Sequence, residues 1–194
     1  EVISVTAFGK YIQNPISRVT VNSSSNSVSF VNIGDKGHVF GVEMEFRKDL
    51  YQNNNTRIYT FLNGTYLNTN QELDREKVVA ETTTSYSNTI SIDPSKSSDK
   101  MQGASDFLAN LNLGFEQKWG SQNSLDLVVS YSHISDNIYA IGYANKGNLV
   151  DKAINVLDAV AKVKFANGIG FSVSGKNLLN PSFKRVQENT NGDV

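Results

Sequence analysis

The sequence predicts an antiparallel all-β fold, and three observations support this prediction. Apolar and polar residues alternate with a period of two along several segments, as they do in strands that have one apolar and one polar face. Asn, Ser and Thr are abundant, at 23, 22 and 11 of 194 residues, whereas charged residues reach only 19%. The segments between the alternating runs are alternately long and short. Together these features are typical of strands joined by polar loops.

About seven strands are predicted in chain order. Alternation is clear in 40–47, 107–116, 125–132 and 169–175, and weaker in the β-branched and aromatic runs near 2–12 and 57–68. The segment from Leu149 to Phe165 fits two structures, because Leu149, Ala153, Leu157 and Val160 have helical spacing while 157–165 also alternates. The following Asn167-Gly168 is a strong hairpin signal, so a strand is preferred over a helix there.

The predicted connections are 13–36, 49–56, 69–104, 119–123, 140–153 and 167–168, alternately long and short. Consecutive turns of a meander lie at opposite ends of the sheet, so all the long loops are expected at one end. Outer-membrane barrels are built in this way, with short periplasmic turns and long extracellular loops. A loop of the length of 69–104 is uncommon in a compact soluble domain. No run of 18 apolar residues exists, which excludes a transmembrane helix but not barrel strands. The sequence thus favours an up-and-down transmembrane β-barrel wall.

The alternation divides the strand residues into two sets. One set is apolar and is predicted to face lipid: Phe40, Val42, Met44, Phe46, Leu111, Leu113, Phe115, Leu125, Leu127, Val129, Phe171 and Val173. The other set is predicted to face a wet lumen: Glu43, Glu45, Arg47, Asn110, Asn112, Glu116, Asp126, Ser130, Lys162, Lys164, Ser172 and Ser174. The same alternation would also suit a soluble β-sandwich, whose core would take the apolar set.

Aromatic residues near the predicted strand ends favour the membrane interpretation. Tyr51, Trp119 and Phe165 fall at the short-turn end, and Tyr11, Tyr131 and Tyr139 fall toward the long-loop end. Aromatic belts occupy both interfaces of a membrane protein.

Catalytic and nucleic-acid functions find no support in the residues. The formal charge is −1, which gives no basic surface for nucleic acid, and the absence of Cys excludes thiolate chemistry and Cys-ligated zinc. His38 and His133 have no neighbouring ligands in the sequence and are expected at a surface or interface. The inward-facing charges, which also include Lys118, Asp158 and Lys176, number five of each sign and predict no charge selectivity. We therefore expect neither an enzyme nor a cofactor or metal site.

Several longer motifs follow one another along the chain: Phe8-Gly9-Lys10-Tyr11-Ile12-Gln13-Asn14-Pro15-Ile16, Phe30-Val31-Asn32-Ile33-Gly34, Val39 to Leu50, Met101 to Asn110, and Lys176-Asn177-Leu178-Leu179-Asn180-Pro181. They resemble the barrel strands of TonB-dependent outer-membrane receptors, in particular those of Bacteroidetes-type bacteria. None has a chemistry of its own, and the resemblance rests on their order and spacing across most of the chain.

The resemblance implies a barrel of about 22 strands that is plugged by an N-terminal domain. Residues 1–194 would then be a C-terminal segment of an outer-membrane barrel domain, without the plug and the early strands. The closing strand is also expected to be absent, because 189–194 reads as a loop. The implied function is TonB-energised import of a nutrient such as a siderophore, corrinoid, glycan or peptide. The implied partners are outer-membrane lipid, the plug and the remaining strands, TonB and a surface substrate-binding lipoprotein. The alternative is a secreted β-sandwich that serves in binding or adhesion.

Overall fold

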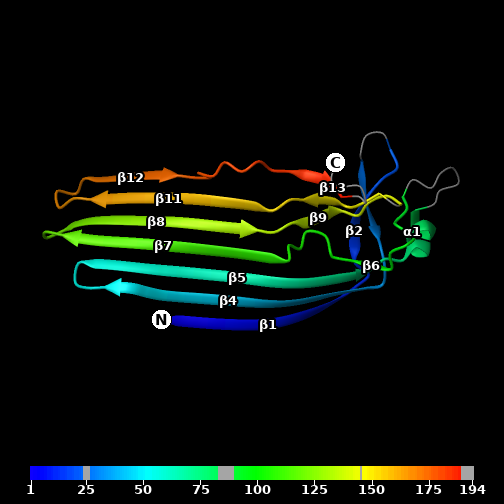
Figure 1. Ribbon diagram of the computed structural model, residues 1–194, viewed down its shortest axis with the longest axis horizontal. Coiled ribbons are helices and arrows are strands. Elements are labelled where there is room, and N and C mark those ends of the chain that lie inside the picture. The colour runs from blue at the N-terminus through cyan, green and yellow to red at the C-terminus, as the bar shows by residue number, and fades with distance from the viewer. Residues whose placement is uncertain (24–26, 83–89, 145, 189–194) are drawn as a thin grey trace.

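The computed structural model describes all residues except 24–26, 83–89, 145 and 189–194, and its largest element is an open antiparallel sheet (Figure 1). Seven long strands follow one another across this sheet in chain order, and β1 and β12 form its edges. They are β1 (Val2–Gln13), β4 (Lys36–Gln52), β5 (Thr56–Glu72), β7 (Phe107–Trp119), β8 (Asn123–Ile134), β11 (Ile154–Lys164) and β12 (Gly170–Gly175). The predicted seven-strand meander is therefore confirmed, including the strand interpretation of the segment before Phe165.

The connections are sorted by length between the two ends of the sheet (Figure 1). Residues 53–55, 120–122 and 165–169 form short turns at one end, and 14–35, 73–106 and 135–153 form long connections at the other. Short and long connections alternate along the chain, as predicted. Because every strand reverses direction relative to its predecessor, the short connections share one end of the sheet and the long ones share the other.

The turn around Asn167-Gly168 differs from the predicted two-residue hairpin. Gly168 donates its N–H to the Phe165 carbonyl at 3.0 Å and has φ +85°, whereas Asn167 does not have a positive φ. A two-residue type I′ turn requires positive φ at both central residues. The hairpin therefore uses a three-residue loop in which only the glycine takes the left-handed conformation.

The long connections were predicted to be loops, and for much of their length this is wrong. They contain the hairpin β2 (Ile16–Thr20) and β3 (Val28–Asn32), the helix α1 (Arg75–Thr82), β6 (Ser98–Asp99), which pairs with β5, and β9 (Asn137–Ala140) and β10 (Leu149–Asp151). The segment after β12 ends in β13 (Arg185–Gln187), which pairs with β10. We call these elements and their connections the cap. The predicted loop 189–194 lies outside the described residues.

The cap contains the hydrophobic core of the described chain. Its buried members come from all three long connections: Val19, Val31, Ile33, Leu73, Val78, Ile90, Ile92, Ile138 and Ile141. Helix α1 begins with a recognisable signal, because the Asp74 carboxylate accepts the Lys77 N–H at 3.0 Å. Leu73 before this N-cap residue and Val78 in the first turn are both in the core, as in a hydrophobic staple.

The strands β8 and β11 lead from the sheet into β9 and β10 of the cap, and their pairing keeps the same register. The pairing of Ile134 with Ile154 continues in step to Asn137 with Asp151, because each strand advances by three residues between these pairs. On the next strand, ten residues separate Gly175 from Arg185, while eight separate their partners Ala159 and Asp151. The surplus of two residues lies in a bulge where Asn177 and Asn180 have φ of 54° and 46°.

Candidate functional site

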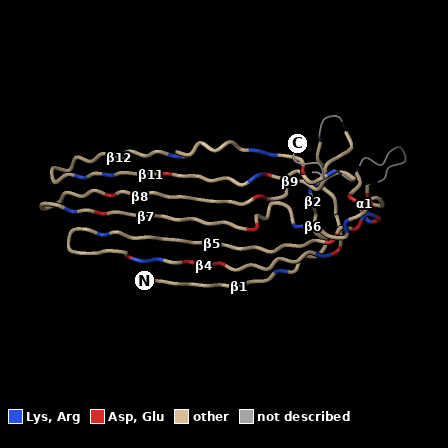
Figure 2. Tube along the Cα trace, viewed as in Figure 1, with Lys and Arg blue, Asp and Glu red and all other residues tan. Residues whose placement is uncertain are grey.

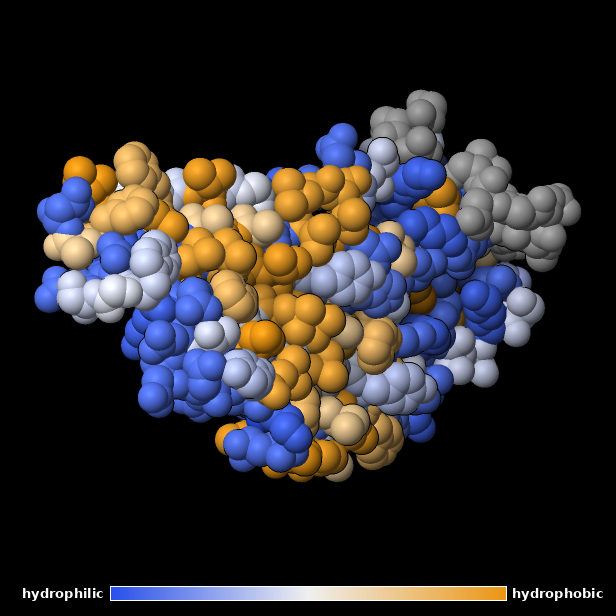
Figure 3. Space-filling view, turned by 60° about the vertical axis from the view of Figure 1, so that its left-hand side comes forward, coloured by the Kyte–Doolittle hydropathy of each residue, from blue (hydrophilic) through white to orange (hydrophobic). Residues whose placement is uncertain are grey.

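One face of the sheet carries all twelve residues of the predicted lipid-facing set. Directly paired residues of an antiparallel ladder lie on the same face, and the ladder joins Phe46 to Leu62, Leu62 to Leu111 and Leu111 to Tyr131. We call this the apolar face. It is uncovered in the described chain, since Phe40, Met44 and Val173 are 60%, 58% and 72% exposed. Figure 3 shows apolar side chains gathered in a band over the sheet, bordered by hydrophilic ones.

The opposite face carries all twelve residues of the predicted lumen-facing set, and we call it the polar face. Its ladder joins Glu43 to Thr65, and further along it joins Glu116 to Asp126 and Asp126 to Lys162. Asn112 accepts a hydrogen bond from the Ser130 hydroxyl at 2.6 Å. Charged residues lie at intervals along the strands and gather around the cap (Figure 2). Which face meets lipid and which meets the lumen stays a prediction.

Aromatic rings cluster on the apolar face at the short-turn end. The Trp119 and Phe165 rings meet edge to face at 6.5 Å between centroids, and Phe165 meets Phe171 at the same distance. These residues come from the ends of three different strands, so the contacts form a row across the sheet. Such a row suits an interface between hydrocarbon and water.

The polar face has an ion-pair chain near the short turns. Arg57 Nε lies 2.7 Å from Asp49 Oδ1, and Arg57 Nη1 lies 3.3 Å from Glu116 Oε1, while the guanidinium covers the Tyr59 ring at 4.6 Å. A shallow cavity of about 440 Å³ opens between this chain and Arg47. One guanidinium thus lies between two carboxylates in this chain.

Large side chains also occupy the polar face, which the alternation pattern did not predict. They fit because glycines on the neighbouring strands leave room for them. A Cβ added to Gly114 would lie 2.1 Å from Cζ of Tyr59, and one added to Gly41 would lie 2.3 Å from Cζ of Phe8. Both glycines therefore accommodate aromatic rings laid along the wall.

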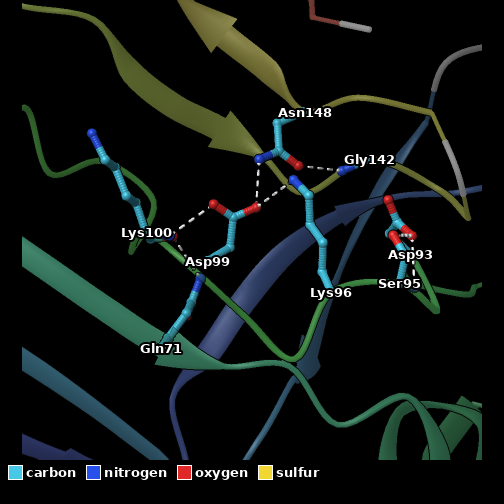
Figure 4. A network of polar contacts seen from close by, with 8 residues as sticks. All are labelled: Gln71, Asp93, Ser95, Lys96, Asp99, Lys100, Gly142 and Asn148. Atoms are coloured by element: carbon cyan, nitrogen blue, oxygen red, sulfur yellow. Dashed lines mark hydrogen bonds and ion pairs between the residues drawn. The ribbon is translucent and has the colours of Figure 1, made fainter. Parts of the chain in front are cut away.

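A hydrogen-bond network ties the cap to the polar face of β5 (Figure 4). The buried Gln71 accepts a hydrogen bond from the Ser17 hydroxyl at 2.8 Å and donates one to the Lys100 carbonyl at 3.1 Å. Asp99 then accepts the Lys100 N–H at 2.8 Å and the Asn148 amide at 2.8 Å. These residues belong to the three long connections and to β5, so the cap is anchored on the polar-face side of the sheet.

An ion pair outside the sheet joins α1 to the connection before β4. Lys77 Nζ lies 2.6 Å from Asp35 Oδ1. This hydrogen bond lowers the pKa of the Asp35 carboxyl and raises the pKa of the Lys77 amine. The Lys77 side chain is 22% exposed and that of Asp35 is 72% exposed, so solvent screens the pair.

A row of arginine and aromatic side chains lies on the cap and was not expected from the sequence. The Arg18 guanidinium carbon lies 4.0 Å from the Tyr139 ring centroid, and that of Arg185 lies 3.1 Å from the same centroid. Two guanidinium groups this close to one centroid cannot share a face of the ring, so the ring lies between them. Arg18 also covers Phe30 at 5.5 Å, and Arg185 covers Phe183 at 5.5 Å. We call these five residues the arginine–aromatic row. Their wide separation in the sequence gave no signal.

The two histidines lie on the apolar face toward the cap. His38 contacts the Tyr11 ring at 5.2 Å, and His133 Nδ1 lies 2.7 Å from the Asn155 side-chain oxygen. Among the described residues, no group of three His, Asp or Glu side chains is placed to hold a metal ion.

Within the described ranges, no helix is both long and apolar enough to cross a membrane. A family model described as TonB dependent receptor-like, beta-barrel matches residues 2–178. No curated protein and no solved structure matches the chain.

Proposed function

The chain belongs to the TonB-dependent receptor-like β-barrel family, and from this premise we propose that it forms the wall and part of the extracellular cap of a nutrient importer. The family is one of outer-membrane receptors and transporters, not of enzymes. Its members work with a plug domain and with TonB.

The observation that carries the proposal is the arrangement of the two faces relative to the cap. One face is apolar across all seven strands and uncovered, whereas the cap is anchored by Gln71 on the polar side. A soluble sandwich requires a second sheet over the apolar face. Within the described ranges, the buried core lies in the cap instead. Lipid against the apolar face would remove these side chains from water without a second sheet.

The cap is proposed to face the outside of the cell and the short turns to face the periplasm. Substrate would then meet the cap first and pass along the polar face, together with the plug and the rest of the barrel. Imported siderophores, corrinoids, glycans and peptides are all compatible with a charge-balanced wall. A surface lipoprotein that delivers substrate would dock on the cap side.

These 194 residues contain no Cys, so a Cys introduced among them can be compared with the unsubstituted receptor in a labelling test of sidedness. Ser97→Cys lies in an exposed part of the cap, and Asn54→Cys lies in the exposed short turn 53–55. In intact cells that express the full receptor, a membrane-impermeant maleimide should label the first variant. It should label the second only after the outer membrane is permeabilised. Labelling of Asn54→Cys but not Ser97→Cys in intact cells would reverse the proposed orientation.

Transport is tested separately by nutrient depletion from the medium. Cells with the receptor should deplete a nutrient that receptor-null cells leave, and deletion of TonB should abolish the difference. Depletion that persists without TonB would contradict energised import.

A further inference from the structure

The arginine–aromatic row lies on the same side of the wall as the apolar face. The strands β8 and β11 continue in step into β9 and β10, so Asp151 faces the same side as Leu157 and Asn155. Arg185 pairs with Asp151 in the ladder and binds its carboxylate through Nε at 2.5 Å and Nη2 at 3.0 Å. Tyr139 and Arg18 lie on this side as well, because the Arg185 and Arg18 guanidinium groups both stack on the Tyr139 ring.

The row lies beyond the apolar band, toward the cap. Asp151 is six residues past Leu157, the last apolar residue of this face on β11. Six residues span about 20 Å of strand, or about 15 Å along the membrane normal at the usual barrel tilt. The residues between them on this side are Asn155 and Ala153, so the large apolar side chains of this strand end at Leu157. The row is therefore outside the hydrocarbon layer and level with bulky head groups.

A cavity of about 500 Å³ adjoins the row. Its lining includes Tyr139, Tyr143, Arg185, Lys146 and Gln187. Among the residues that the structure describes, no carboxylate lines it. This combination of cations, phenols and an amide can bind phosphate oxygens together with sugar hydroxyls.

The local charge is positive. Asp151 neutralises Arg185, but no described carboxylate lies within ion-pair distance of Arg18 or Lys146. Arg18 is held against Tyr139 by stacking and by a hydrogen bond from Nη1 to the Tyr139 carbonyl at 3.3 Å. Its cation is thus fixed in place and available to an anion.

We propose that the arginine–aromatic row and its cavity bind the phosphorylated sugar head group of a glycolipid in the outer leaflet. This inference rests on the proposed function, because it requires the apolar face to be in lipid. An imported substrate is the poorer occupant, since it must reach the polar face, whereas this cavity is lined by Arg185 and Tyr139 on the other side of the wall. The bound head group would tether the cap to the membrane surface around the receptor.

The test uses the full receptor, purified in detergent and examined by native mass spectrometry. The probe is lipopolysaccharide with phosphorylated core sugars, compared with the same preparation after its phosphates are removed. The variants are Arg18→Gln and Lys146→Gln, alone and combined, with Arg18→Lys as the charge-retaining variant. Lys36→Gln is the matched control, because Lys36 lies exposed on the same side and at the same end, on β4.

The phosphorylated probe should bind the native receptor more tightly than the dephosphorylated one. Each neutral variant should lose about fivefold in affinity, the equivalent of ~1 kcal/mol per cation at a lipid surface. Arg18→Lys should keep most of the binding, and Lys36→Gln should keep all of it.

Three results would overturn the proposal: equal binding of the two probes, unchanged binding by the combined variant, or occupancy by inorganic phosphate without any by the lipid. The last result would identify a site for a small soluble anion. Failure of the proposed function is recognised independently, because a receptor that is not a barrel would lack heat-modifiable migration in electrophoresis. A receptor with normal migration and no lipid selectivity contradicts only the lipid site.

Discussion

Substitution of Val129 by Arg tests which face of the sheet meets lipid. Val129 lies in the middle of β8 on the apolar face, between Leu113 and Ala159 of the neighbouring strands. Val129 is 43% exposed, so a longer side chain at this position can extend away from the sheet without a steric clash. In water the substitution would cost little for this reason. In a bilayer, an Arg near the midplane of a barrel's outer face costs about 2–4 kcal/mol.

Ser130→Arg is the matched control on the next residue of the same strand. Ser130 faces the polar side, where it pairs with Asp158 in the ladder and donates its hydroxyl to Asn112. The substitution loses that hydrogen bond, worth about 1 kcal/mol, and places the new cation beside a carboxylate. We expect a net cost of at most about 1 kcal/mol.

The assay is urea unfolding of the full receptor in lipid vesicles, with the folded fraction measured by electrophoretic migration. Val129→Arg should reduce the folding equilibrium constant by about 30-fold or more, because 1.4 kcal/mol corresponds to tenfold. Ser130→Arg should reduce it by less than about tenfold. Equal costs for the two variants, or a larger cost for Ser130→Arg, would refute the assignment of the apolar face to lipid.

Three further predictions concern the wall and the cap. Gly114→Ala should cost about 1–3 kcal/mol by displacing the Tyr59 ring, while Gly64→Ala, whose Cβ would lie 3.6 Å from its nearest neighbour, should be tolerated in the same urea assay. Gln71→Leu should leave the Ser17 hydroxyl and the Lys100 carbonyl without their partner and cost about 1–3 kcal/mol; unchanged protease resistance of the cap would contradict this. The lowered pKa of Asp35 means that its contribution to cap stability is present above the ordinary carboxyl pKa and is lost as the pH falls through the lowered value. Lys77→Met should remove this acid dependence in hydrogen exchange of α1, and an unchanged pH profile would show that the pair does not stabilise the cap.

The strands and their facing were predictable because each depends on local alternation. In β7 and β8 the apolar residues recur at every second position, so Leu113 and Val129 could be assigned to one face before any pairing was known. The same logic resolved 157–165, where the helical spacing was weaker than the combination of alternation and Asn-Gly. Alternation does not show where a glycine on a neighbouring strand leaves room for a large side chain. Tyr59 and Phe8 were therefore not expected on the polar face.

The cap was not predictable from periodicity because its apolar residues alternate over only two or three positions at a time, as Ile90 and Ile92 do. Val19, Ile33 and Ile92 come from connections far apart in the chain, and they meet only after the sheet brings the connections together. Helix α1 was an exception that local signals could have revealed, since Asp74 caps it between Leu73 and Val78. The contact of Arg18 with Arg185 through Tyr139 depends entirely on tertiary structure.

The two-residue surplus between Gly175 and Arg185 constrains how this segment can vary during evolution. The surplus lies in the bulge that contains Asn177 and Asn180. Arg185 therefore lies on the same side of the wall as its partner Asp151. A strand that gains or loses one residue exchanges its two sides, whereas a change of two residues restores them. Natural length changes between positions 176 and 184 should therefore come in steps of two wherever the Arg185–Asp151 pair is kept. Relatives with an odd change should have lost that pair or carry a second odd change nearby.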